Sequence, residues 1–167
     1  MPETAEQYRD RLASYVEGQD ALNLQSEAPA RLARLIEGVP EAKLKERPQP
    51  GRSSAVEILA HLAEDELTSS WRYRQMIEHD GETLLGFDQE LWARLGNYQS
   101  WNARDALDMF RLLRDANVRM LRGLPAEEWN RSGNHAERGR LTVGELARHM
   151  AAHDVNHIKQ IECLLSR

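Results

Sequence analysis

The sequence contains one cysteine, Cys163, which excludes an internal disulfide and a cysteine-rich zinc module. It also lacks an excess of basic residues: 22 Lys and Arg against 27 Asp and Glu give a formal net charge of -5. A nucleic-acid partner is therefore not expected. No stretch approaches the roughly 20 apolar residues of a membrane-spanning helix, and the opening MPETAEQYRD lacks the cationic start and apolar run of a secretory signal. We expect a cytoplasmic protein with no membrane partner.

Alternation of apolar and polar residues, which would predict β-strands, is almost absent. Instead, apolar residues recur every three or four positions over long windows, which predicts helices. Two capping boxes, Ser54 with Glu57 and Thr142 with Glu145, predict where two of these helices begin. We expect helices over 4–17, 26–37, 54–80, 100–123 and 142–167, with Pro29 in the first turn of the second.

These segments predict an all-α fold in one domain over residues 1–167. We expect a four-helix bundle of up-and-down order, with an additional N-terminal helix. A long connection of about 20 residues joins the second and third bundle helices, and this length usually indicates a crossover or a functional element.

The most informative segment is RHMAAHDVNHIKQ, in which His149, His153 and His157 are spaced four residues apart. At about 100° per residue, His153 and His157 lie within about 40° of each other and near the apolar line of the last helix, whereas His149 lies at its edge. Two imidazoles with this spacing are close enough to bind one metal ion. The alternative is a pair of buried, hydrogen-bonded core histidines.

A third metal ligand must come from a facing helix. The candidate is His61 in ILAHLAEDE, with Glu64 and Asp65 as carboxylate alternatives. His61 lies roughly 110° from the middle of the apolar stripe of its own helix, so periodicity alone does not select it. The alternative for His61 is an ordinary surface histidine.

The helix EILAHLAEDE and a last helix that begins at LTVGEL and continues as HDVNHIKQI resemble the DinB-like superfamily of four-helix bundle proteins. The resemblance covers most of the chain, including RLASYVEG, GFDQELW and LRGLPAEEWNRSG. It implies a divalent metal held by His61, His153 and His157, while His149 matches no family ligand. The family often has Trp-Ser before the second bundle helix, where this chain has Ser53-Ser54, so an aromatic side chain near the site is missing.

Three neutral imidazoles leave an open coordination position, as in catalytic rather than structural metal sites. Such an ion can lower the pKa of bound water to about 7 or deprotonate a bound thiol. The resemblance implies both outcomes, because the family includes metal-dependent hydrolases and transferases that use a low-molecular-weight thiol. We therefore expect a metal-dependent enzyme acting on a small molecule, with zinc as the default metal and nickel or iron as alternatives. The competing hypothesis is a non-catalytic homodimeric bundle with a vestigial or regulatory metal site.

Further residues are expected to support the metal ligands. Glu64 and Asp65 are the acids closest in sequence to a ligand, and one of them is a candidate general base. Gln160, about 20° from His153 around the helix, is expected to orient a ligand or a bound water, with His149 as a second supporting residue.

The long connection is expected to cover a pocket. Arg72, Asp88 and Trp92 are the candidates for lining it. Asp88 can equally begin a short helix, and Trp92 can equally fill the core.

Overall fold

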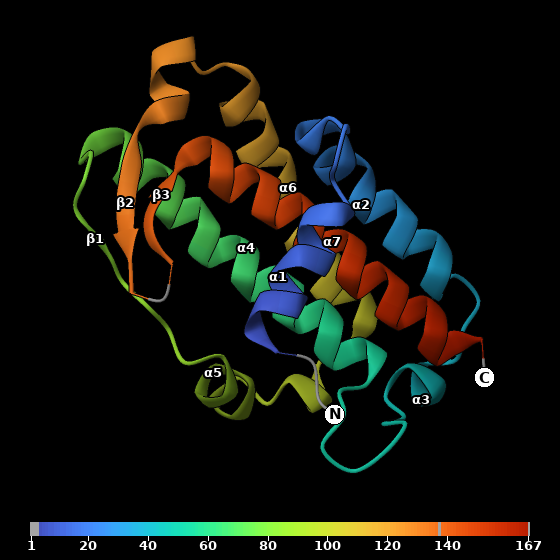
Figure 1. Ribbon diagram of the computed structural model, residues 1–167. Coiled ribbons are helices and arrows are strands. Elements are labelled where there is room, and N and C mark those ends of the chain that lie inside the picture. The colour runs from blue at the N-terminus through green and yellow to red at the C-terminus, as the bar shows by residue number, and fades with distance from the viewer. Residues whose placement is uncertain (1–3, 137, 167) are drawn as a thin grey trace.

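The computed structural model describes residues 4–136 and 138–166. Helices α2, α4, α6 and α7 form a four-helix bundle, and α1 packs against α7 as an additional N-terminal helix (Figure 1). The predicted all-α bundle is therefore confirmed. Among the described residues, no helix combines the length and apolar character needed to span a bilayer. The helices are α1 (Ala5–Ser14), α2 (Ala21–Ile36), α3 (Glu41–Leu44), α4 (Ala55–Glu78), α5 (Gln89–Leu95), α6 (Ala103–Arg122) and α7 (Val143–Leu165), with short 3-10 helices η1 (Tyr98–Ser100) and η2 (Ala126–Asn130).

Local capping sets the start of the two helices that matter most for the site. The hydroxyl of Ser54 accepts a hydrogen bond from the backbone N–H of Glu57, and the Glu57 carboxylate accepts one from the N–H of Ser54. Thr142 and Glu145 make the same reciprocal pair at the start of α7. Both predicted capping boxes are confirmed.

Helix α2 begins at Ala21, because the Asp20 carboxylate caps it by accepting from two backbone N–H groups. The expected start near residue 26 was wrong, and Pro29 consequently lies inside the helix rather than in its first turn. A proline there leaves the carbonyl of Gln25 without its helical donor. The guanidinium of Arg114 from α6 donates to this carbonyl at 3.3 Å. A side chain from another helix thus replaces the bond that Pro29 cannot make.

The bundle does not have the up-and-down order that we expected. Helices α4 and α6 run parallel: Glu66 pairs with Arg114, and one turn further along both helices Ser70 bonds Asn117. Helices α2 and α7 run in the opposite direction (Figure 1). Residues 79–102 form the connection that carries the chain back along the bundle to the start of α6. The long connection is therefore a crossover, which the parallel pair requires.

The structure adds a small sheet that the sequence analysis did not predict. Its strands are β1 (Thr83–Leu84), β2 (Ser132–His135) and β3 (Gly139–Thr142). β2 pairs in parallel with β1 and antiparallel with β3. Segments of two to four residues are too short to show the alternation that predicts a strand. Arg138, which follows β2, reaches α7, because its Nη2 lies 3.1 Å from Nε2 of His149.

A polar layer divides the hydrophobic core along α4 and α7. On one side, Leu59 and Ile158 belong to a cluster that also includes residues of α2 and α6. On the other side, Tyr73 and Met150 belong to a cluster that reaches the sheet. Buried polar and charged side chains of α4 and α7 lie between the two, and the candidate site occupies this layer.

Candidate metal centre

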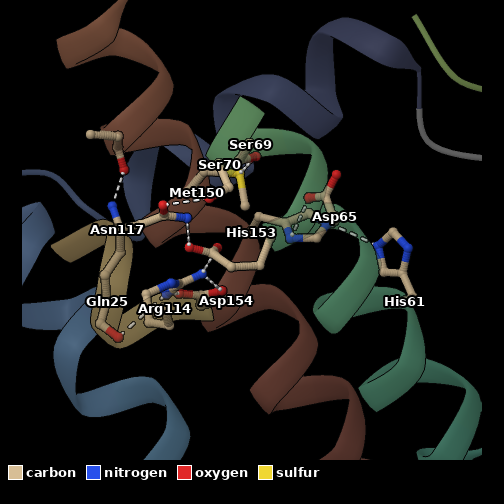
Figure 2. Close-up of polar contacts among 12 residues, drawn as sticks. Gln25, His61, Asp65, Ser69, Ser70, Arg114, Asn117, Met150, His153 and Asp154 are labelled. Atoms are coloured by element: carbon tan, nitrogen blue, oxygen red, sulfur yellow. Dashed lines mark hydrogen bonds and ion pairs between the residues drawn. The ribbon is translucent and has the colours of Figure 1, made fainter. Parts of the chain in front are cut away.

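Three imidazoles meet in the polar layer where α4 faces α7. His61 Nε2 lies 3.1 Å from His153 Nε2, which in turn lies 3.0 Å from His157 Nε2. One ring nitrogen of each residue lies within 4.8 Å of the other two. Figure 2 shows His61 and His153 reaching toward each other from the two helices. The structure thus brings together the three residues that the resemblance implies as metal ligands.

His61 reaches this cluster because α4 is buried on two sides. One side packs against α6 and the other against α7. The side toward α7 carries His61, Asp65 and Ser69, spaced one turn apart, and these contact residues of α7. Polar residues on a buried face do not add to an apolar stripe, so helical periodicity could not place His61 toward α7.

Burial keeps the three imidazoles neutral. Loss of solvent lowers the pKa of His61 to about 4 and that of His157 to about 3. It lowers the pKa of His153 well below the ordinary value, and the neighbouring histidines contribute to the decrease. Neutral imidazoles carry the lone pairs that metal coordination needs.

A hydrogen bond behind His157 directs the lone pair of this imidazole toward the cluster, and a carboxylate lies close to the back of His153. Gln160 Oε1 lies 2.9 Å from His157 Nδ1, so Nδ1 donates and Nε2 keeps its lone pair. His153 Nδ1 is buried without a hydrogen bond, and the closest carboxylate oxygen, Asp65 Oδ2, is 3.5 Å away. A small movement would let Nδ1 donate to Asp65 and leave His153 Nε2 facing the cluster. The donor set and the groups behind it therefore fit a divalent metal.

The two carboxylates predicted as candidate general bases point in different directions. Asp65 is 7% exposed, lies beside His153 and lines the adjoining cavity. Burial, helped by the charge of Glu66, raises the pKa of Asp65 to about 7. Glu64 faces η1, where its carboxylate accepts a hydrogen bond of 2.5 Å from the hydroxyl of Tyr98. The structure brings Asp65 to the cluster and directs Glu64 away from it.

A buried ionic network lies behind the cluster, and the sequence analysis did not anticipate it. Arg114 of α6 is fully buried and pairs with Glu66 of α4. It also pairs with Asp154 of α7 (Figure 2). Asn117 donates to the second oxygen of Glu66 at 2.7 Å. Burial would lower the pKa of Arg114, but the two carboxylates outweigh it and raise the pKa. Since Glu66 and Asp154 directly follow Asp65 and His153, the network joins the two helices at the level of the site.

A cavity of about 590 Å³ adjoins the cluster, a size typical of small-molecule sites. Its walls come from α1, α4, α7, the crossover and the β2–β3 turn. The described lining residues include Tyr8, His61, Asp65, Ser69, Arg72, Phe87, Asp88, Gln89, His135, Arg138, His149, Met150, His153 and His157. A small molecule in this cavity can therefore contact the three imidazoles directly.

Arg72 and Asp88 line the cavity, as expected, whereas Trp92 instead packs against the Phe87 ring with centroids 4.8 Å apart. Asp88 also begins α5, since its carboxylate accepts from the N–H of Leu91. The sequence analysis missed Tyr8 and the residues of the β2–β3 turn, because they reach the cavity only through tertiary packing.

His149 lines the cavity next to the cluster rather than within it. Its ring centroid is 6.0 Å from that of His153, and its Nε2 lies 3.1 Å from Nη2 of Arg138. Burial, together with the nearby positive charge of Arg138, lowers the pKa of His149 to about 3.

The fold is similar to that of YfiT from Bacillus subtilis, described as a probable metal-dependent hydrolase with an unusual four-helix bundle topology. The two structures superpose with a TM-score of 0.81 at 18% sequence identity, over 96% of this chain and 87% of that one. A curated relative from Oceanobacillus iheyensis, provisionally named metal-dependent hydrolase OB0782, is 23% identical over 111 residues. That match covers 66% of this chain and 64% of the relative, so it spans less than two thirds of the relative's length.

The family model of the DinB superfamily matches residues 25–161. This range contains four of the five elements that build the site, together with the three clustered histidines. The chain belongs to the DinB superfamily.

Proposed function

We propose that this protein is a metal-dependent enzyme that acts on a small molecule, with hydrolysis as the leading reaction. The convergence of His61, His153 and His157 on one point at the wall of a cavity carries this proposal. The names of the two similar proteins, both of which refer to metal-dependent hydrolysis, support it.

His61, His153 and His157 would hold the metal, with Gln160 orienting the ring of His157 and Asp65 placed 3.5 Å from Nδ1 of His153. A divalent cation held by neutral ligands supplies a Lewis acid and lowers the pKa of a bound water. Zinc is the default, with nickel and iron as alternatives, because all three accept imidazole ligands. Asp65 is the carboxylate placed to accept a proton in the cavity, whereas Glu64 is held by Tyr98.

A thiol-dependent transferase is the second candidate reaction. The observation that favours it is the neutral donor set, which leaves the full positive charge of the cation to stabilise a thiolate. A low-molecular-weight thiol would then be the cosubstrate.

The competing hypothesis is a non-catalytic homodimer with a vestigial or regulatory metal site. Large apolar side chains on the outer surfaces of two helices favour self-association. These are Leu67 and Trp71 on α4 and Leu112 on α6, exposed by 44%, 64% and 60%. Light scattering coupled to size-exclusion chromatography measures the mass of the assembly.

The deciding experiment is elemental analysis by inductively coupled plasma of protein purified without added metal. We expect near-stoichiometric metal in the wild type and its loss in His153→Ala. The matched control is His79→Ala, because His79 is exposed at the end of α4 and lies outside the cluster. A metal-free, fully folded wild type would contradict the proposal.

Activity requires a separate measurement on the metal-loaded protein. A screen of simple esters and amides tests hydrolysis, and the same electrophiles with added thiols test transfer. Turnover that depends on His153 and needs no thiol supports the hydrolase. Turnover that requires a thiol supports the transferase, and no turnover with either class supports the non-catalytic bundle.

A further inference from the structure

One guanidinium joins all four helices of the bundle. Arg114 of α6 is fully buried, and its two terminal nitrogens donate hydrogen bonds to each of the other three helices. Nη2 donates to Glu66 of α4 at 2.7 Å and to Asp154 of α7 at 3.0 Å. Nη1 donates to the second oxygen of Asp154 and, at 3.3 Å, to the backbone carbonyl of Gln25 in α2. Arg114 is therefore the central contact of the bundle.

The partners of Arg114 are themselves held in place. Both oxygens of Glu66 accept hydrogen bonds, one from Arg114 and the other from Asn117 at 2.7 Å. The guanidinium also lies over the buried ring of Phe110, 4.7 Å from its centroid. A shift of α4 or α7 would pull a buried carboxylate away from its cation, which is costly in free energy. The network therefore resists movement of these two helices relative to each other.

The residues of this network lie next to the clustered histidines in the chain. Asp154 directly follows His153 on α7, and Glu66 follows His61 by five residues on α4. Figure 2 shows Asp154 pointing toward Arg114, while His153 reaches toward His61. Because a helix is rigid over so short a distance, the contacts that place Glu66 and Asp154 also place His61 and His153.

Hydrophobic packing alone does not supply the precision that a metal site needs. Apolar contacts are non-directional, so they tolerate a small rotation or slide of one helix against another. Metal ligands must lie within about 0.5 Å of their productive positions. Hydrogen bonds between ionised groups are directional. The network of Arg114 thus provides a directional constraint between the two helices that carry the histidines.

We propose that Arg114 is a positioning residue for the metal site. By holding Glu66 and Asp154 together, it sets the rotation of α4 relative to α7 and so brings His61 to His153 and His157. The inference rests on the proposed function where a metal is concerned, but the convergence of the imidazoles requires no metal.

Arg114→Lys tests this role, with zinc as the probe and competition with a chromophoric chelator as the measurement. Lysine keeps a positive charge near the carboxylates but lacks the planar fork that bonds both of them. We expect zinc affinity to fall by about tenfold or more, as when a group that orients a metal ligand is removed. The affinities are compared at a temperature at which the wild type and the variants are all folded.

The matched control is Leu121→Ala, because Leu121 is fully buried on the same helix and belongs to the apolar cluster near the sheet. Its truncation destabilises the fold through a cavity and leaves the network intact. Zinc affinity in this variant should stay within about twofold of the wild type, as expected for an independent site. An equal loss of affinity in Leu121→Ala and Arg114→Lys would overturn the proposal.

Asn117→Ala keeps the proposal testable if Arg114→Lys does not fold. It releases one oxygen of Glu66 and leaves Arg114 in place. We expect a smaller decrease in zinc affinity, of about threefold. Wild-type affinity in a folded Arg114→Lys, or in Asn117→Ala where the lysine variant does not fold, would overturn the proposal.

Nuclear Overhauser effects between the ring protons of His61 and His153 provide a measurement on the metal-free chain. We expect them in the wild type, where the two Nε2 atoms are 3.1 Å apart, and in Leu121→Ala, but not in Arg114→Lys. A wild type that binds no zinc, with ring contacts that disappear in Arg114→Lys, would retain the positioning role and lose the proposed function. A wild type that binds zinc, with affinity and ring contacts unchanged in Arg114→Lys, would retain the proposed function and overturn the positioning role.

Discussion

The side-chain oxygen of Gln160 lies 2.9 Å from Nδ1 of His157, one turn earlier on α7. The contact fixes the tautomer and the ring orientation of His157. We expect Gln160→Ala to weaken metal binding by about 10- to 100-fold, the usual effect of removing a group that orients a metal ligand. Competition with a chromophoric chelator measures the affinity. Glu162→Gln is the control, because Glu162 is a neighbouring exposed residue whose ion pair is with Arg31. Equal losses of metal affinity in the two variants would contradict the role of Gln160 in orienting His157.

Asp65 and Glu64 provide a test of which carboxylate serves the site. We expect Asp65→Asn to lower both metal affinity and turnover, because Asp65 lies beside His153 and lines the cavity. Glu64→Gln should leave both unchanged and cost about 1 kcal/mol of stability, since it changes only the hydrogen bond with Tyr98. Metal titration and urea unfolding of the two variants check this. A loss of turnover in Glu64→Gln alone would reverse the assignment.

Arg114 is expected to be one of the most sensitive positions for stability. Arg114→Met leaves Glu66 and Asp154 buried without their cation, which costs about 3 to 5 kcal/mol. Arg111→Met on the same helix removes only exposed ion pairs with Asp108 and Asp115, worth less than about 1 kcal/mol. Urea unfolding measures both free energies. Similar values for the two variants would show that the buried network contributes little.

Gly133 permits the close packing of β2 on β1. A Cβ at this position would lie 2.5 Å from Cγ of Leu84, a side chain that is only 2% exposed and has little room to move. We expect Gly133→Ala to cost about 1 to 3 kcal/mol through overpacking, and Leu84→Ala in the same chain to relieve part of that cost. Gly86→Ala is the control, because its Cβ would meet no atom within 4 Å. Thermal unfolding compares the variants, and an unchanged melting temperature in Gly133→Ala would refute the packing argument.

Local sequence determined much of the helical framework. The capping boxes at Ser54 and Thr142 act through residues three positions apart, so both helix starts were predictable. The spacing of His153 and His157 placed both on one side of α7 for the same reason, since side chains four residues apart lie on one face of a helix. The start of α2 was missed because the cap at Asp20 was not recognised, although it too is local.

Only the tertiary structure decided which groups meet. The crossover makes α6 parallel to α4, and this arrangement brings Arg114 to Glu66. The second buried side of α4 turns His61 and Asp65 toward α7. These contacts join residues far apart in the chain. They depend on which helices are neighbours in the bundle and on how each helix is rotated about its own axis. Hydrophobic periodicity indicates which side of a helix is apolar, but not which helix packs against that side. The sequence by itself therefore determined the helices and the pairing of His153 with His157. Tertiary packing decided that His61 joins this pair and which residues form the walls of the cavity.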